Sequence, residues 1–480
     1  MRWQTIHDRL FVALVVLCTG YLLVVARGAQ VRERARLVQP LEAQPKTGER
    51  DEARLSSIME DAKLGRGDGP DVVFIAIDGL RADAISALGG WTPTPALEAF
   101  AQGARVAAAV QAPSPEAAAS RVSLLTGVHP IEHGVYRLRN GGWPRGDIRA
   151  TLPKRLARAG WATVGISANS IEDDERHVRR GFDIAIDEKM TAAEDGLPYL
   201  RADRVTDLAL SAFQTLEGGP RFLWVEYGDL QTPWVPWEPW IDNPLTLVSY
   251  AMWWPGKTKV GWNKRFANLM KKGSSVSNDT METWRVVYSA ELQLVDREIG
   301  RLLDGLGVDE SDWVVLVGVN GMYLGEHSLL GDGYDVYQEG VAVPLLIRGP
   351  ASLDTPAGSA DVPNLLLEAL GLTPLPSVEA YGLAVSEVRY APPEVLKASY
   401  GQRFKRVRRA WLDVEAPEHL LILDSGGAEE AYDLSDGGYE RLKDAPWADD
   451  LRERAGLWLI ARGEGKAISE EKAPPKKGAP

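Results

Sequence analysis

The sequence predicts an α/β protein built on a large, mostly parallel sheet flanked by helices and followed by a small antiparallel subdomain. Five short, nearly continuous apolar runs alternate with helical patterns, which is typical of strands buried on both faces of a parallel sheet. The chain has 480 residues, of which 45% are hydrophobic and 25% charged, so it can bury a large core. We therefore expect a folded protein.

An apolar run lies near the N-terminus. Residues 10–26 read LFVALVVLCTGYLLVVA between Arg9 and Arg27, which is close to the shortest length that spans a bilayer as a helix. We predict a single retained membrane anchor within residues 1–36. A cleaved signal peptide is the alternative, although no clear small-x-small cleavage site follows the run. The polar residues 37–69 are expected to form a linker.

The main domain is predicted to span residues 70–390. Its expected strands are, in chain order, Val72–Ile77, Ala162–Ile166, Phe222–Val225, Trp313–Val317 and Val343–Ile347. Between the third and the fourth, apolar residues from Leu292 to Leu306 recur on one stripe of a helical pattern. We expect that stripe to pack against the sheet while the charged residues beside it face solvent.

After about residue 390 the pattern changes. Two short strands are expected at Arg409–Val414 and His419–Leu423, followed by a helix at Asp449–Ala461. These elements predict a small α+β subdomain with an antiparallel sheet over residues 391–462. The tail 463–480, which ends in EEKAPPKKGAP, is expected to be disordered.

Charge and cysteine content exclude several functions. The chain has 54 Lys and Arg residues against 67 Asp and Glu residues, a net charge of −13. This balance argues against a general nucleic-acid binder, because phosphate neutralisation needs a cationic face. The single cysteine, Cys18, lies in the apolar run, so the folded part has no disulfide, thiolate metal site or cysteine nucleophile.

Ligands of an open parallel sheet bind beyond the carboxyl ends of its strands, so chemistry is expected there. The relevant pieces include IDGLRAD at 77–83, TPALEAFAQG at 94–103 and SRVSLLTGVHPIEHGV at 120–135, and later RRGFD, YLGEHSLLGDGYDVYQEGVAVPLLIRGP and EEAYDLSD. In this order, from about residue 70 to 462, they resemble the sulfatase family of the alkaline phosphatase superfamily. The resemblance implies an alkaline-phosphatase-like sandwich and metal-assisted cleavage of monoesters.

The catalytic positions that the resemblance implies are altered. The family's nucleophile, a Cys, Ser or Thr four residues before Arg121, falls on Ala117, whose methyl group cannot attack sulfur or phosphorus. The histidine of a DPHTP-like piece is Gln231, and the lysine expected after the LGEH-like piece is Asp332. The nucleophile, the acid for the leaving group and the cationic lysine are therefore all missing from the positions that the resemblance implies. This combined loss predicts that hydrolysis is lost.

The implied metal ligands are depleted as well. The early Asp pair is Asp78 and Gly79, and the late pair, an Asp followed by Asn or His, is Val319 and Asn320. Valine offers no lone pair to a hard cation, and two scattered oxygen ligands fall short of a hard-metal site. We expect no cofactor, while a weakly bound divalent cation such as calcium stays open.

The surviving polar residues have structural explanations. Arg121 is placed to hold a sulfate or phosphate at a helix start, but an ion pair with Glu116 is the favoured interpretation. His133 and His327 are interpreted as packed or hydrogen-bonded side chains. The hydroxyls near the missing nucleophile are Ser114, Ser120 and Ser123, and capping is favoured for Ser120.

Residues 234–272 interrupt the family pattern and are rich in tryptophan and cations. The candidate binding patch consists of Trp253, Trp254, Trp262, Lys257, Lys259, Lys264 and Arg265. One interpretation is a lid whose indoles pack over the old pocket. The other is a surface for anionic polysaccharide or lipid headgroups, where indoles stack on sugars or settle at a bilayer interface and the cations meet phosphate or carboxylate.

The sequence thus predicts a membrane-anchored, catalytically inactive sulfatase-like protein that serves as a binding or scaffolding module in the cell envelope. The domain is expected outside the cytoplasm because long domains translocate largely regardless of flanking charge, although several arginines follow the span. No nucleic-acid partner is expected, and the protein partner is unknown. The alternative is a divergent ester hydrolase with Ser114 or Ser120 as nucleophile and Asp78, Asn320 and Asp332 around a metal.

Overall fold

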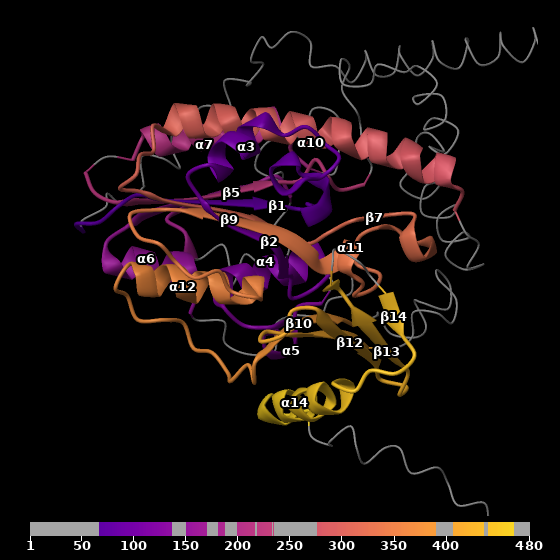
Figure 1. Ribbon diagram of the computed structural model, residues 1–480. Helices are drawn as coiled ribbons and strands as arrows, with labels where there is room; N and C mark the ends of the chain where they lie inside the picture. The colour runs from indigo at the N-terminus through magenta and orange to yellow at the C-terminus, as the bar shows by residue number, and fades with distance from the viewer. Residues whose placement is uncertain are drawn as a thin grey trace, which may run out of the picture.

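A seven-stranded sheet lies between two layers of helices in the computed structural model (Figure 1). The structure describes residues 67–136, 150–169, 181–187, 199–216, 218–232, 234, 276–389, 407–435 and 440–464. One face of the sheet is covered by α3 (Pro95–Ala101), α7 (Ala202–Gln214) and α10 (Asn278–Leu306). The other face is covered by α4 (Ala117–Thr126), α6 (Leu152–Ala159) and α12 (Val362–Ala369). The predicted α/β fold is confirmed.

The strands of this sheet follow the order β2-β9-β6-β1-β5-β3-β4. Their bounds are β1 Val72–Ile77, β2 Arg105–Gln111, β3 Ala162–Ser167, β4 Ile184–Ile186, β5 Arg221–Tyr227, β6 Trp313–Gly318 and β9 Ala342–Arg348. All neighbours from β6 to β4 pair in parallel, whereas β9 is antiparallel to both β6 and β2. The sheet is therefore mixed, with a parallel centre.

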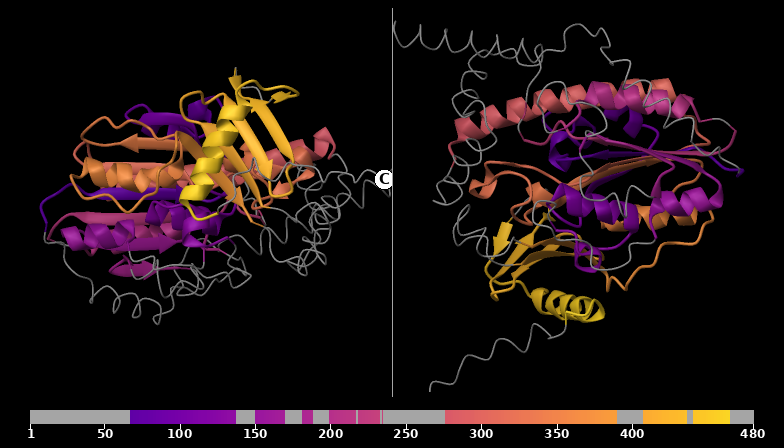
Figure 2. Two further views of the ribbon diagram at one scale, coloured as in Figure 1. Left: turned by 90° about the horizontal axis from the view of Figure 1, so that it is seen from below. Right: turned by 180° about the vertical axis from the view of Figure 1, so that it is seen from behind.

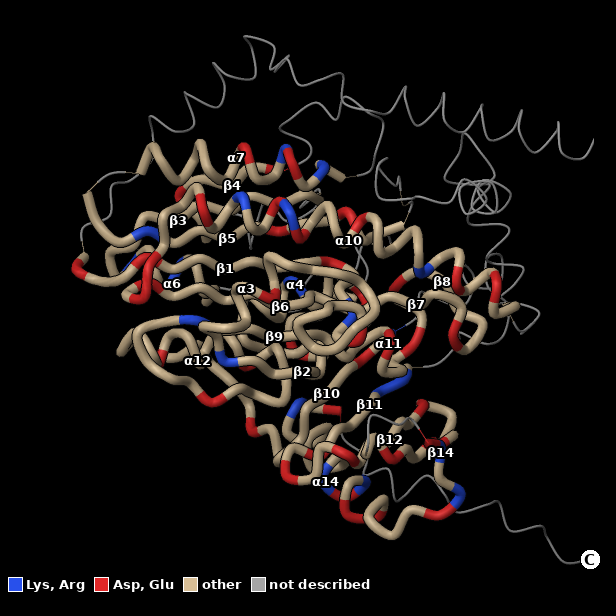
Figure 3. The backbone as a smooth tube through the Cα atoms, turned by 45° about the horizontal axis from the view of Figure 1, so that its top comes forward, with Lys and Arg blue, Asp and Glu red and all other residues tan. Residues whose placement is uncertain are grey.

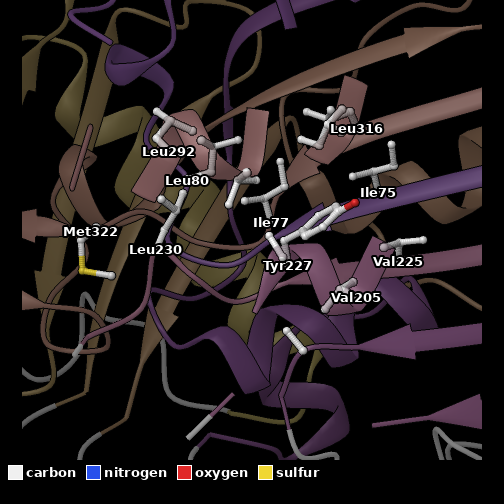
Figure 4. Close-up of a cluster of buried hydrophobic side chains, with 14 of the residues drawn as sticks. Ile75, Ile77, Leu80, Val205, Val225, Tyr227, Leu230, Leu292, Leu316 and Met322 are labelled. Atoms are coloured by element: carbon white, nitrogen blue, oxygen red, sulfur yellow. The ribbon is translucent and has the colours of Figure 1, made fainter. Parts of the chain in front are cut away.

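The side chains of β1 alternate between two apolar clusters. Ile75 and Ile77 belong to the cluster under α7 and α10, whereas Phe74 belongs to the cluster on the opposite face. Figure 4 shows Ile75 and Ile77 near the ring of Tyr227 of β5, with Leu292 of α10 beside Leu80 in the same cluster. Leu292 lies on the predicted stripe and is fully buried. This two-sided burial explains why the strand sequences are continuous apolar runs.

Short elements lie between the main ones. They are α5 Pro130–His133, α11 Gln338–Val341, β7 Tyr323–Leu324, β8 Leu330–Gly331 and the 3-10 turns at Ala82–Ala84, Ser86–Leu88, Glu326–Ser328 and Ser359–Asp361. The long helix α10 begins after Ser277, whose hydroxyl accepts the amide hydrogen of Thr280, and ends at Gly307 in the left-handed conformation with φ of 64°. A polar cap thus fixes the start of this helix, and a glycine in the left-handed conformation ends it.

A separate five-stranded antiparallel sheet follows, in the order β10-β11-β12-β13-β14. The strands are β10 Leu383–Val388, β11 Arg408–Asp413, β12 His419–Asp424, β13 Glu429–Asp433 and β14 Glu440–Leu442. The helix α14, Ala448–Ala461, lies against this sheet (Figure 2). It packs through Trp458, whose ring centroid lies 5.3 Å from that of Trp411. The predicted antiparallel subdomain is confirmed. Its expected start at residue 391 is corrected, because the sheet already includes β10.

The small sheet is bonded to the main domain at two places. The amide of Glu387 in β10 donates to the carbonyl of Pro113 over 2.8 Å, and the hydroxyl of Ser386 donates to the carbonyl of Ala112. On β11, Arg408 pairs with Asp335 of the main domain at 2.7 Å. These contacts hold the subdomain against the segment that leads into α4.

Several predicted segments lie outside the described residues. These are the anchor at 10–26, most of the linker, the binding patch at 253–265 and most of the tail. Within the described ranges, no helix is both long and apolar enough to cross a membrane.

Acidic and basic residues are interspersed along α10 and over the C-terminal subdomain (Figure 3).

Candidate functional site

The ends of the central strands and the start of α4 bring most of the predicted site residues together. Asp78 follows β1, Glu226 lies near the end of β5, and Asn320 follows β6. Arg121 comes from the second turn of α4, on the face of the helix that meets the sheet, and is 5% exposed. The predicted residues therefore gather at the carboxyl edge of the parallel strands, which is where the sequence analysis expects chemistry.

Asp78 is completely buried and accepts hydrogen bonds from three side chains at Oδ2. Arg121 donates from Nη2 over 3.1 Å, Asn169 donates from Nδ2 over 2.6 Å, and Gln231 donates from Nε2. Burial and the adjacent Glu226 carboxylate raise the pKa of Asp78 well above its ordinary value, and Arg121 only partly offsets them. The predicted metal ligand is thus a hydrogen-bonded, buried carboxyl group.

Arg121 lies between two buried carboxylates. Its Nε donates to Oε1 of Glu226 over 2.6 Å, and Oε2 of Glu226 accepts the hydroxyl of Ser167 over 2.6 Å. The favoured ion pair of Arg121 with Glu116 is therefore wrong: the partners are Asp78 and Glu226. Glu116 is the N-cap residue of α4, whereas Arg121 lies more than one turn further along the helix. The side chain of Arg121 therefore meets the carboxyl groups at the strand ends instead of Glu116.

Asn320 is tied into the backbone rather than free to bind a cation. Its Oδ1 accepts the amide of Gly79 over 3.1 Å, and its Nδ2 donates to the carbonyls of Pro115 and Gly321, each over 3.0 Å. Its neighbour Val319 is fully buried in the same apolar cluster as Ala117. Ala117 and Val319, the positions that the sequence resemblance assigns to a nucleophile and a metal ligand, therefore belong to the packed apolar core.

These residues do not fit a divalent cation. The Asn320 oxygen is engaged by an amide, and Asp78 Oδ2 accepts three donors, which leaves Asp78 Oδ1 as the acidic oxygen without a hydrogen bond. Among the described residues, no group of three His, Cys, Asp or Glu side chains has metal-binding geometry. Hard cations such as calcium take six to eight oxygens, so this donor set is too small.

Asp332 lies at the same edge. The amide of its neighbour Gly333 donates to the carbonyl of Pro115 over 3.0 Å, which places Asp332 beside the loop that precedes Ala117. Asp332 is half-buried and also raises the pKa of Asp78. At the position where the resemblance implies a lysine, this chain therefore adds negative charge to the site.

The nearby hydroxyls are engaged in local structure. Ser120 Oγ donates to the carbonyl of Ser114 over 2.7 Å and accepts the Ser114 amide over 3.0 Å, while Ser114 Oγ accepts the Glu116 amide over 3.2 Å. Both serines are buried. These bonds shape the turn before α4. The expected capping role of Ser120 is corrected, because the N-cap residue is Glu116 and Ser120 lies inside the helix, where its hydroxyl bonds the backbone of Ser114.

His133 and Ser123 form a hydrogen bond of 3.0 Å between Nε2 and Oγ. His133 Nδ1 accepts the amide of Val135 over 3.1 Å, so the neutral ring carries its proton on Nε2 and donates to the serine. Burial lowers the pKa of His133 to about 3. This polarity is opposite to that of a catalytic Ser-His pair, in which the histidine accepts the serine proton. The interpretation of His133 as a hydrogen-bonded structural side chain is confirmed.

Comparison with known proteins decides the family. Residues 70–372, more than half of the chain, match the family model described as sulfatase. The chain belongs to the sulfatase family. Among curated relatives of this sulfatase-family chain is the uncharacterized sulfatase YidJ of Escherichia coli strain K12, 28% identical over 162 residues. That match covers 31% of each protein, so the chain matches less than a third of this relative's length.

Solved structures share the fold of this sulfatase family member. The phosphonate monoester hydrolase of Silicibacter pomeroyi matches with a TM-score of 0.60 at 19% identity, over 84% of this chain and 97% of that one. A protein solved in complex with its substrate D-glucosamine-2-N,6-O-disulfate matches with a TM-score of 0.61 at 17% identity, over 85% of this chain and 100% of that one. At these identities the likeness concerns the fold.

Sequence reasoning missed three members of the site in this sulfatase family member: Glu226, Ser167 and Asn169. Glu226 and Ser167 each follow directly after the apolar run that predicts their strand, and both are buried at the strand end. A polar residue directly after a buried run is a usable signal, because such a group needs a partner when it is buried. Asn169 follows β3 and had no distinguishing pattern.

Proposed function

We propose that this sulfatase family member does not hydrolyse esters and works as a membrane-anchored binding or scaffolding module in the cell envelope. The observation that carries the proposal is the packing of Ala117 and Val319. Both side chains lie in one apolar cluster, at the positions where the family resemblance implies a nucleophile and an anionic metal ligand. A site that has been filled with methyl groups at these positions supplies neither function.

Each requirement of monoester cleavage meets a specific obstacle. Attack needs an activated oxygen or sulfur, and Ala117 has none. Charge neutralisation needs cations directed at the transferring group, but Arg121 is directed at Asp78 and Glu226. Leaving-group protonation needs an acid, and the amide of Gln231 is neutral and donates to Asp78. The obstacles are independent, so one substitution does not remove them.

The competing function is a divergent ester hydrolase that uses Ser114 or Ser120. It requires a hydroxyl that is free to attack and a base that takes its proton. In this chain Ser120 Oγ is hydrogen-bonded to the backbone of Ser114, and the first residue of α4 is Ala117, so neither serine stands where the resemblance implies the nucleophile. These contacts favour the inactive alternative.

Turnover by the full chain in detergent tests the first part of the proposal. The relatives suggest the substrates: an aryl sulfate, an aryl phosphate, a phosphonate monoester and a sulfated glucosamine, each with and without added calcium, zinc or manganese. We expect hydrolysis at the uncatalysed rate, with the Silicibacter pomeroyi phosphonate monoester hydrolase as the active control. Turnover that disappears in Ser114→Ala or Ser120→Ala would establish the hydrolase instead.

We further propose that residues 1–36 anchor the protein in the membrane, with the domain outside the cytoplasm, and that the patch at 253–265 binds anionic polysaccharide or lipid headgroups. The patch proposal rests on the indoles and cations of the sequence, since a protein with a net charge of −13 otherwise repels such polymers. Indole faces supply stacking area, and ammonium groups supply attraction that salt screens.

Binding to vesicles that contain an anionic lipid, and to an acidic glycan, tests the patch. We expect binding that weakens as salt rises and falls when the four patch cations are replaced by glutamine. The test variant replaces Lys257, Lys259, Lys264 and Arg265, and a charge-matched control replaces Arg105, Lys154, Arg158 and Lys443. Equal binding by the two variants would rule out the patch as the binding surface and leave the lid interpretation.

A further inference from the structure

We infer that the guanidinium of Arg121 is a built-in cation that bridges Asp78 and Glu226 in place of a divalent metal. The inference concerns what holds the site together, so it stands or falls separately from the absence of turnover. Its starting point is that two carboxylates, both completely buried, meet at the end of the sheet and both contact the same arginine.

The charges at the site require a cation. A buried carboxylate without a compensating partner is strongly unfavourable, and here two lie together. Asn169, Gln231 and Ser167 donate hydrogen bonds to them but carry no charge. Within the described residues, Arg121 is the cationic side chain that touches either carboxylate, and it touches both. Arg121 therefore supplies, next to these carboxyl groups, the positive charge that a metal ion would otherwise supply.

The geometry suits a guanidinium rather than a metal ion. Arg121 directs both Nε, over 2.6 Å, and Nη2 at Oε1 of Glu226, and Nη2 also donates to Oδ2 of Asp78 over 3.1 Å, so one planar fork of donors meets both carboxyl groups. A metal ion needs oxygens converging on one point, and Val319 contributes none while Asn320 is engaged by Gly79.

The same contacts exclude a role for Arg121 as a sulfate or phosphate anchor. Two of its nitrogens already donate to carboxylates, and an incoming anion would be repelled by Asp78, Glu226 and the half-buried Asp332. The arginine that the resemblance places at the start of the nucleophile helix has thus become an internal structural cation. The site accordingly takes up neither the metal nor the anionic ester.

Thermal unfolding of the full chain, with calcium, magnesium or sodium at equal ionic strength, tests the inference. We expect the parent's midpoint to be the same in each salt. Arg121→Met should lower the midpoint by roughly 5 °C or more, because it leaves buried carboxylates without their cation. Adding Glu226→Gln to Arg121→Met should recover most of the loss, since it removes the charge that Arg121 compensates.

Arg221→Met is the matched control. Like Arg121, Arg221 pairs with an aspartate, in this case Asp71, but its side chain is partly exposed. It lies on β5 at the end of the strand opposite to Glu226. It should lose little stability and show no recovery with Glu226→Gln. If Arg121→Met does not fold, recovery of folding by the added Glu226→Gln is the readout.

Two results would overturn the inference. One is a midpoint of the parent that rises specifically with calcium or magnesium, which would place a metal beside Arg121. The other is an additive or larger loss in the Arg121→Met, Glu226→Gln double variant, including failure to recover folding. Turnover in the separate ester assays bears on the proposed function and not on this result, so the two failures are distinguishable.

Discussion

Replacing His133 by asparagine should remove part of the acid sensitivity of the fold. His133 is buried beside α4, where Nε2 contacts Ser123 and Nδ1 accepts the Val135 amide. In His133→Asn the side-chain oxygen is placed to keep the bond from Val135, while the titrating ring and the bond to Ser123 are lost. The variant therefore separates the proton-linked part of His133's contribution from its local hydrogen bonding.

The magnitude follows from the shift in pKa. Burial lowers the pKa of His133 from 6.5 to about 3, so between these pH values the unfolded chain binds a proton that the folded chain does not. Unfolding is then favoured as the pH falls. At about pH 5 this linkage lowers the free energy of unfolding by about 2 kcal/mol relative to neutral pH. His129, whose pKa burial also lowers to about 3, acts in the same direction and remains in the variant.

The assay is chemical unfolding of parent and variant at neutral pH and at about pH 5. We expect the variant to lose about 2 kcal/mol less than the parent on acidification. Ser123→Ala, which removes the same side-chain hydrogen bond but keeps the ring of His133, is the control and should keep the parent's acid loss. An identical acid loss in parent and His133→Asn would refute the assignment, because His133 would then bind its proton as readily in the folded chain as in the unfolded chain.

Three further predictions concern the site, the domains and the membrane. Ala117→Ser should leave turnover of aryl sulfate and aryl phosphate at the uncatalysed rate. It should also lower the free energy of unfolding by about 1 kcal/mol, because the hydroxyl enters the apolar cluster of Val319. Measurable turnover by this variant would show the rest of the site to be intact. Arg408→Met, which removes the pair to Asp335, should speed limited proteolysis of the C-terminal subdomain, whereas Arg452→Met, whose pair with Glu429 lies within the subdomain, should not. A reporter fused after residue 480 should be active outside the cytoplasm, and activity confined to the cytoplasm would contradict the predicted orientation.

The central strands could be predicted from the sequence because they are buried on both faces. Each expected run, such as Val72–Ile77, coincides with a strand to within a residue or two. The direction of β9 could not be read in this way, because its apolar run looks the same in parallel and antiparallel pairing. The signal lies in the connection: the segment between β6 and β9 contains short turns and α11 but no crossover helix, so the chain returns antiparallel.

The start of the small sheet and the partners of Arg121 were harder to predict for a common reason. Both depend on buried polar residues whose partners are distant in sequence. In β10, Ser386 and Glu387 interrupt the apolar pattern, yet both are buried because they bond to Ala112 and Arg409. Glu226 likewise meets Arg121 from 105 residues away. A sequence pattern shows that such a residue is polar, but the fold decides what satisfies it.

The Arg121 ion pairs also bear on how this chain can change in evolution. Restoring an aspartate at Val319 alone would add a third carboxylate to a buried pair that has one cation. Removing Arg121 alone would leave that pair without compensation, and neither change supplies a nucleophile at Ala117. Each of these single changes toward a metal site is expected to lower stability. If the chain has lost hydrolysis as proposed, restoring it therefore requires several substitutions at once.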